Sequence, residues 1–295
     1  MITGRYMGRI GNNMFQYATY YALSRKTNYF LKIPEIKGFP NTSTVFGKEI
    51  HETDKKYKIP TKFGNMVNYS KLNTDPQQTI ESNNHWENTY NFYEYKEEIK
   101  IIFDLPHYLE EDHKYFIINR NKNIYENIKL EEPITKNDLV ISLRLGDFLR
   151  PIIKTNPPLR ILLYSYFKII IDNVKHNRLF ITSDEPFHPF VNEFRDHNPI
   201  IVENEDPIKT MAFVAKFNKI GISQSTFSWW AAFLSEAQEI YFPIPKNGPF
   251  SLKKELVTKD HYIRVHEPRY KYVQQTSGEI FDWIDAPGRR DLEDF

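Results

Sequence analysis

The sequence has 295 residues, of which 26% are charged and 40% hydrophobic, and its 39 basic residues nearly balance its 38 acidic ones. This composition is that of a globular protein with one large or two ordinary domains. The net charge of +1 argues against nucleic acid or an anionic membrane as the main partner. The absence of cysteine excludes disulfides, thiolate metal sites and cysteine nucleophiles.

Targeting segments are not evident in the sequence. No run approaches the roughly 20 apolar residues of a membrane span. The opening residues MITGRYMGRI lack the apolar stretch of a signal peptide. A cytoplasmic location and no integral membrane segment are therefore expected.

The N-terminal half, residues 1–129, is predicted to be an α/β domain with long loops. Its periodicity indicates a strand over 1–7, a helix over 12–26 and a second strand over 28–35. Residues 36–90 are rich in Asn, Thr, Lys and Pro, which indicates long loops with short elements. Residues 94–127 indicate pieces of helix interrupted at Pro106.

The C-terminal half, residues 130–295, alternates predicted strands and helices. The strands are expected at 138–143, 178–183, 199–204, 218–223 and 239–245, and the helices at 159–175, 186–197, 206–217 and 225–238. Strands that read as continuous apolar runs are typical of a parallel sheet with helices on both faces. We therefore predict a Rossmann-like domain here. After Pro249 the periodicity fades, and one option is that the last thirty residues pack back on the N-terminal half.

The first motif is GRIGNNMFQYA at 8–18, between the first strand and the first helix. Gly8 and Gly11 allow a sharp turn and a close approach to a ligand, and the helix N-terminus favours an anion. Neither the dinucleotide fingerprint nor the P-loop pattern is present. A purely structural turn is the alternative, although Arg9 and Asn12 are polar groups that such a turn does not need.

Two further motifs follow predicted strands. ISLRLGDF at 141–148 ends in Arg144 and Asp147, and FITSDE at 180–185 contains Asp184. Ligands of parallel sheets bind beyond the carboxyl ends of the strands, where Arg suits phosphate and a carboxylate suits ribose or guanine. The alternatives are an Arg–Asp pair that fixes a loop and an Asp184 side chain that caps the next helix.

The fourth motif is SQSTFSWWAA at 223–232. Ser225 or Thr226 is the expected N-cap of a helix whose buried body begins with Trp229 and Trp230. Hydroxyls and free N–H groups at that helix N-terminus form a candidate anion site.

In this order the four motifs resemble those of the α-1,2-fucosyltransferase family, glycosyltransferase family 11. The family carries Gly-x-x-Gly-Asn-Gln-Met-Phe-Gln-Tyr-Ala, His-x-Arg-Arg-Gly-Asp-Tyr, Ser-Asp-Asp and Ser-x-Ser-Thr-Phe-Ser-Trp-Trp-Ala-Ala. The resemblance spans residues 8–235. It implies a GT-B-like fold of two Rossmann-like halves facing a cleft. It also implies inverting, metal-independent transfer of L-fucose from GDP-β-L-fucose to a 2-hydroxyl of a galactose-like glycan, in α-1,2 linkage. The sequence has no D-x-D motif of the kind that binds a metal-bridged diphosphate, and no cofactor is expected.

The resemblance also implies roles for residues of this chain. Arg144 would hold the β-phosphate and neutralise the departing GDP, and Asp147 would act as base or orient Arg144. Asn12 would act beside the sugar. The donor would be bound by the remaining positions, Arg9, Gly11, Ser142, Asp184, Ser223, Ser225, Thr226 and Phe227.

Three positions depart from the family motifs. Ser142 stands in place of the His, Leu145 in place of the second Arg and Asn13 in place of the Gln after Gly-Asn. Two alternatives therefore stay open: the same scaffold with another nucleotide sugar or acceptor linkage, and a non-catalytic glycan-binding relic. The sequence specifies neither the acceptor nor the oligomeric state.

Overall fold

The computed structural model describes residues 1–43, 56–59, 67–72, 79–82, 85–105, 116–119, 124–127, 132–146, 162–203, 206–244 and 263–285. The chain divides into two compact units. The first comprises Met1–Asp104, Lys253–Arg264 and Leu292–Phe295, and the second comprises Leu105–Leu252 and Val265–Asp291.

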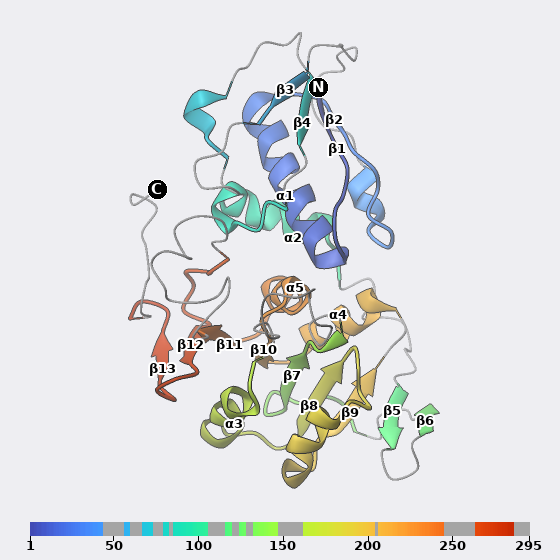
Figure 1. The fold of residues 1–295 in the computed structure, drawn as a ribbon, viewed down its shortest axis with the longest axis vertical. Coiled ribbons are helices and arrows are strands. Elements are labelled where there is room, and N and C mark those ends of the chain that lie inside the picture. The colour runs from blue at the N-terminus through green and yellow to red at the C-terminus, as the bar shows by residue number, and fades with distance from the viewer. Residues whose placement is uncertain are drawn as a thin grey trace, which may run out of the picture. The chain divides into compact units, whose positions relative to one another are not determined.

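The first unit contains a four-stranded parallel sheet in the order β2-β1-β4-β3. Its strands are β1 (Ile2–Gly4), β2 (Leu31–Lys32), β3 (Lys56–Lys58) and β4 (Thr79–Ser82). The helix α1 (Ile10–Thr27) connects β1 to β2, so the predicted strand–helix–strand start of the chain is confirmed. Both the carboxyl end of β1 and the N-terminus of α1 therefore lie at one edge of this sheet (Figure 1).

Close packing of α1 against the sheet depends on a glycine. A Cβ at Gly4 would lie 2.7 Å from the Tyr20 hydroxyl, so only glycine lets this ring approach β1. Tyr20 and Leu23 of α1 join Ile2, Leu31 and other buried residues in one core cluster. The helix ends where Asn28 adopts left-handed backbone angles, with φ of 57°, as is common for a residue following a helix.

The remaining elements of the first unit are short. They are the helix α2 (Lys96–Ile102) and the 3-10 turns η1 (Pro40–Ser43), η2 (Tyr69–Lys71), η3 (Thr89–Asn91) and η4 (Tyr93–Tyr95). Short elements within 36–90 were predicted. The sequence did not indicate that β4 would pair on both sides within the sheet.

The second unit contains a nine-stranded sheet in the order β13-β12-β11-β10-β7-β8-β9-β5-β6. The strands from β12 to β9 in this order are parallel, whereas β13, β5 and β6 pair in antiparallel fashion. The central strands are β7 (Leu139–Leu143), β8 (Leu179–Ser183), β9 (Ile200–Glu203), β10 (Lys219–Ile222) and β11 (Glu239–Ile244). All five were predicted.

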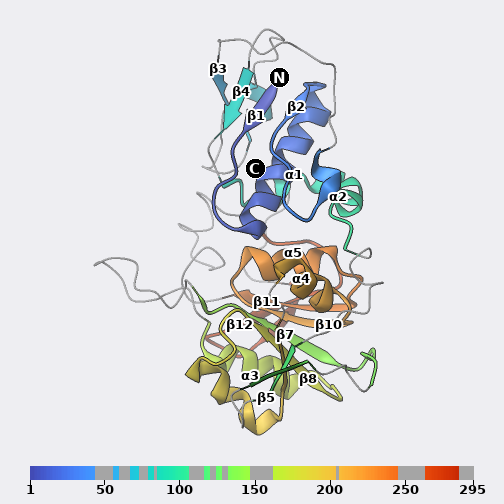
Figure 2. The same ribbon diagram turned by 90° about the vertical axis from the view of Figure 1, so that its right-hand side faces the viewer.

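Helices cover both faces of this sheet (Figures 1 and 2). On one face, Ile141 and Ile181 pack with α3 (Tyr164–Asn173) and the 3-10 helix η7 (Pro189–His197). On the other face, Phe180 contacts Phe213 of α4 (Pro207–Ala215) and Phe217 just after it. Alternate residues of a strand point to opposite faces, so strands buried on both faces are apolar throughout. The predicted α/β class with a parallel sheet and helices on both faces is confirmed.

The edges of this sheet differ from the sequence-based expectation. Residues 94–127 were predicted to contain pieces of helix interrupted at Pro106. The helix α2 lies in this range, but β5 (Phe116–Asn119) and β6 (Ile124–Asn127) form an antiparallel pair, and β5 pairs with β9. This pairing places them with the second unit, whereas the sequence boundary was set near residue 130. At the other edge, β12 (Tyr270–Gln274) and β13 (Ile280–Asp282) extend the sheet beyond β11, in a region where the sequence shows no periodicity.

Within the described ranges, none of the helices combines the length and the apolar character that crossing a membrane requires.

Candidate functional site

Three of the sequence motifs meet at the carboxyl edge of the second sheet. The strands β10, β7 and β8 are adjacent and parallel, so the residues that follow them lie at the same edge. Arg144 follows β7, Asp184 follows β8, and the segment from Ser223 to Ser225 connects β10 to α5 (Thr226–Leu234). Parallel sheets bind their ligands at this edge.

Arg144 is held by Asp184. Its Nη1 lies 2.5 Å from Asp184 Oδ2, and the two side chains are 15% and 25% exposed. The other oxygen, Oδ1, accepts a hydrogen bond of 2.8 Å from the Leu145 backbone N–H. A Cβ at Gly146 would lie 2.2 Å from Oδ2, so the carboxylate fits only because this position is glycine. Arg144, Leu145 and Gly146 thus all lie against the Asp184 carboxylate. An Arg–Asp pair was one of the alternatives drawn from the sequence, and here it joins the residues that follow two neighbouring strands.

The N-terminus of α5 lies beside this pair in the sheet order. Ser225 is the N-cap, and its Oγ accepts from the Phe227 N–H at 3.2 Å. The first turn of α5 contains no acidic side chain, so its N–H groups and partial positive charge are not offset within the helix. Thr226 and Phe227 are half-buried, whereas Trp229 and Trp230 are fully buried. The predicted cap and buried body are both present, and an anion fits this helix end.

Ser142 and Ser223 lie in the interior of the second unit. The Ser228 hydroxyl is 2.9 Å from that of Ser142 and 3.0 Å from that of Ser223. All three side chains are buried. These hydroxyls hold the first turn of α5 against β7 and β10. Ser142 and Ser223 therefore help to position the α5 N-terminus at the carboxyl edge of the sheet.

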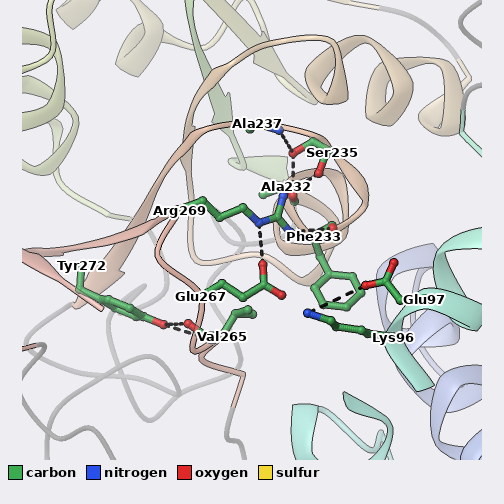
Figure 3. Close-up of polar contacts among 10 residues, drawn as sticks. All are labelled: Lys96, Glu97, Ala232, Phe233, Ser235, Ala237, Val265, Glu267, Arg269 and Tyr272. Carbon is green, nitrogen blue, oxygen red and sulfur yellow. Dashed lines mark hydrogen bonds and ion pairs between the residues drawn. The ribbon is translucent and has the colours of Figure 1, made fainter. Parts of the chain in front are cut away.

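The other end of α5 is fixed by Arg269 (Figure 3). Its guanidinium donates to the carbonyl oxygens of Ser235 at 2.6 Å and Phe233 at 3.1 Å, and pairs with Glu267 at 2.7 Å. A cation that satisfies the last carbonyls of a helix stabilises it. The ring of Trp229 stacks on Phe233 at 4.7 Å. Both ends of α5 are therefore anchored within the second unit, which gives its N-terminus a fixed position.

In the first unit, the glycine motif forms the turn between β1 and α1. Gly8 has a positive φ of 83°, and Arg9 is the exposed N-cap residue of α1, followed by the buried Gly11. The Gln16 amide braces this turn through bonds to both backbone groups of Met7, at 2.9 and 2.8 Å.

Asn12 of this motif contacts His85, which lies shortly after β4. Its Nδ2 is 3.1 Å from His85 Nδ1. With the amide oriented in this way, Asn12 donates, and the neutral imidazole carries its proton on Nε2. The next residue, Trp86, is fully buried with a φ of 56°, a strained conformation for a bulky side chain. Strained backbone of this kind clusters at functional sites.

Asp147, predicted to be catalytic, lies outside the described residues. Leu145 is fully buried in the core cluster that contains α3. Among the residues described, no group of three or more His, Asp or Glu side chains is arranged to hold a metal ion. Sequence reasoning missed the role of Gly146, whose only signal was its place between Arg144 and Asp147.

A parallel α/β sheet with a fixed arginine and a helix N-terminus at its carboxyl edge is typical of proteins that bind phosphorylated ligands, nucleotides among them. The model of glycosyl transferase family 11 matches residues 1–265. The chain therefore belongs to this family and is a glycosyltransferase, which confirms the resemblance drawn from the motifs.

The solved structures that resemble the chain are distant. Crystal structures of POFUT1 in complex with GDP and with GDP-fucose align with TM-scores of 0.39 and 0.37 at 11% and 10% identity. The alignments cover 79% and 80% of this chain, and 94% and 93% of the POFUT1 chains. A search of curated proteins finds no match in sequence.

Proposed function

We propose that this glycosyltransferase transfers L-fucose from GDP-β-L-fucose to the 2-hydroxyl of a galactose-like glycan, with inversion, to form an α-1,2 linkage without a metal ion. The observation that carries the proposal is the family match over residues 1–265, together with Arg144 and the α5 N-terminus at one sheet edge. The fold by itself does not define the donor. Groups suited to a diphosphate at the ligand-binding edge support a nucleoside diphosphate sugar as the donor.

In this proposal the second unit binds the donor. The diphosphate lies at the N-terminus of α5, where the Thr226 hydroxyl and the backbone N–H groups after Ser225 donate hydrogen bonds to its oxygens. The Arg144 guanidinium faces the β-phosphate and neutralises the charge that develops on GDP as the bond from the phosphate oxygen to C1 breaks. Preorganised charge at a leaving group is usually the largest single catalytic contribution. Asp184 keeps this guanidinium in place, and its oxygens retain lone pairs for a ribose or guanine group.

The acceptor oxygen attacks C1 from the opposite face, and the acceptor hydroxyl loses its proton. We propose Asp147 as the base or as a group that orients Arg144. We also propose that Arg9, Gly11 and Asn12 contribute contacts from the first unit. His85, with its proton on Nε2, is able to donate to a sugar oxygen there. Arginine and helix N–H groups supply the positive charge that a metal supplies in other sugar transferases.

The two alternatives have less support. Another nucleotide sugar was suggested by Ser142 and Leu145, yet both side chains are buried in the second unit and are not exposed at its carboxyl edge. A non-catalytic glycan-binding relic would not need an arginine oriented by a carboxylate, nor a glycine at position 146 that leaves room for this carboxylate.

Ligand-induced stabilisation tests the donor. A nucleotide present at 100 times its dissociation constant stabilises the fold by about 2.7 kcal/mol, which shifts the unfolding temperature measurably. We expect GDP and GDP-fucose to shift it and UDP to have no effect. A shift with UDP and none with GDP would contradict the proposed donor.

Product analysis tests the linkage. The protein is incubated with GDP-fucose and a panel of galactosyl, glucosyl and rhamnosyl acceptors, with EDTA present. NMR of the product should show fucose on the 2-hydroxyl of galactose in the α configuration. A different linkage, or loss of activity with EDTA, would refute that part of the proposal. Binding of oligosaccharides without any nucleotide effect would favour the relic.

A further inference from the structure

Gln224 occupies the turn between β10 and α5. The Ser225 N–H donates to the Ser223 carbonyl at 2.8 Å, which places Gln224 at the apex of a tight turn directly before the N-cap of α5. Its neighbours are satisfied, since Ser223 bonds with Ser228 and Ser225 caps the helix. The sequence indicated no role for Gln224, because it fills the variable position of its motif.

The amide of Gln224 is buried without a partner. The residue is 4% exposed, and neither Oε1 nor Nε2 has a hydrogen-bond partner among the residues that the structure describes. Burial removes the amide from water, and no described residue replaces the lost hydrogen bonds, so this side chain costs folding free energy.

Gln16 shows what an ordinary buried glutamine does in this protein. It is fully buried, and its amide makes three hydrogen bonds, two to Met7 and one to the Asn12 carbonyl oxygen. A methionine of similar shape would fill the position of Gln224 without any unpaired polar atom. Among the described residues the Gln224 amide makes no hydrogen bond, so both of its polar groups are available to a ligand.

We infer that Gln224 is a donor-binding residue whose amide pairs with the sugar phosphate of the nucleotide sugar. This inference rests on the proposed function. The amide has an NH2 group that donates and an oxygen that accepts, so a ligand that presents an acceptor and a donor side by side can pair with both. Phosphate oxygens are acceptors only, whereas a sugar attached to a phosphate adds hydroxyl donors. Nε2 donates to an oxygen of the diphosphate at the α5 N-terminus, and Oε1 accepts from a hydroxyl of the transferred sugar.

Gln224→Met is the direct test, with Gln16→Met as the matched control, both in the full chain. Urea unfolding without ligand gives stability, and calorimetry gives the dissociation constants of GDP and GDP-fucose in the absence of acceptor. Gln224→Met should unfold at the wild-type urea concentration or above it, whereas Gln16→Met should unfold at a clearly lower one. For Gln224→Met the dissociation constant of GDP-fucose should rise about tenfold, and that of GDP should rise less, because GDP lacks the transferred sugar.

The outcomes separate this inference from the proposed function. If wild-type protein binds neither GDP nor GDP-fucose, the proposed function fails and the inference fails with it. If wild type binds both and Gln224→Met binds them equally well, only the inference is refuted. It is also refuted if Gln224→Met is destabilised as much as Gln16→Met or does not fold, because the amide would then have a structural role. An equal loss for GDP and GDP-fucose contradicts the contact with the sugar.

Discussion

Replacing Arg144 by Ala should reduce turnover far more than it reduces folding stability. The Arg144–Asp184 pair is partly exposed, at 15% and 25%, and Asp184 keeps its bond from the Leu145 N–H when the guanidinium is removed. Water can therefore solvate the remaining carboxylate, and we expect a stability loss of about 1–2 kcal/mol, at the low end for hydrogen bonds to charged groups. Loss of a preorganised charge at the leaving group costs about 10²–10³ in kcat, or roughly 3–4 kcal/mol.

The matched control for Arg144 is Arg178, because it connects the same two strands at their other ends. Arg178, just before β8, bonds to Asp138, just before β7, through contacts of 2.6 and 3.2 Å. The Asp138 side chain is fully buried, so Arg178→Ala leaves a buried charge without its partner, and the expected stability loss is about 3–5 kcal/mol. This pair lies at the edge opposite to the candidate site, so the kcat of folded protein should not change.

The assay measures GDP release from GDP-fucose with a galactosyl acceptor, at a temperature where both variants are folded, and urea unfolding in parallel. The expected pattern is a large kcat loss with modest destabilisation for Arg144→Ala, and the reverse for Arg178→Ala. If Arg144→Ala keeps a kcat within threefold of wild type, the guanidinium does not act on the leaving group. If both variants lose activity only in proportion to their unfolded fraction, Arg144 is a structural residue.

Three further changes test neighbouring parts of the structure. Gly146→Ala places a Cβ 2.2 Å from Asp184 Oδ2, so it should displace that carboxylate and lower kcat at least tenfold, while a normal kcat would show that Asp184 does not position Arg144. Ser225→Ala removes the N-cap bond to Phe227 and should cost about 1 kcal/mol in thermal unfolding and weaken GDP binding; unchanged GDP affinity in calorimetry would remove the α5 N-terminus from the donor site. Burial would raise the pKa of Asp138, but bonds from Arg178 and the Thr135 N–H lower it on balance. Its contribution to stability is therefore complete above the unfolded-state pKa of about 3.9 and is lost as the pH falls through that value towards the lower folded pKa. Asp138→Asn should make the urea midpoint less dependent on pH below about 4, and an unchanged dependence would contradict this.

The central strands of the second unit could be predicted because each is buried on both faces and reads as an apolar run. The strand from Leu179 to Ser183 is an example, with every residue buried. The outer strands could not, because their pairing depends on partners distant in sequence. Phe116–Asn119 pairs with Ile200–Glu203, and Tyr270–Gln274 continues a sheet that the sequence ended at β11. Edge strands are short and carry no strong pattern, so pairing determines them more than local propensity does.

The candidate site was predictable in its location and not in its internal contacts. Strand ends and an N-cap are local features, so Arg144, Asp184 and Ser225 could be assigned to one edge from periodicity alone. The partner of Arg144 is set by the order of β7 and β8 in the sheet, which brings together residues forty positions apart. The orphan amide of Gln224 is a property of packing, and no sequence pattern reports it.

The departures from the family motifs have a physical account that can be tested by restoring the family residues. Leu145 is fully buried among Leu143, Tyr166 and other residues of the α3-side core, so an arginine there would bury a charge without a partner. Ser142 is 3% exposed, and its hydroxyl bonds to Ser228 across the contact between β7 and α5. A histidine at this position exceeds the space of a serine, and overpacking of this kind costs about 1–3 kcal/mol.

We therefore expect Leu145→Arg to destabilise the protein by at least about 3 kcal/mol. Ser142→His should destabilise it by a smaller amount, and neither change should raise fucose transfer. The measurements are urea unfolding and initial rates with GDP-fucose and other GDP-sugars. If Ser142→His folds with wild-type stability and changes the preferred donor, position 142 acts in the site directly. That result would support the alternative in which the protein uses another nucleotide sugar, against which the burial of Ser142 now argues.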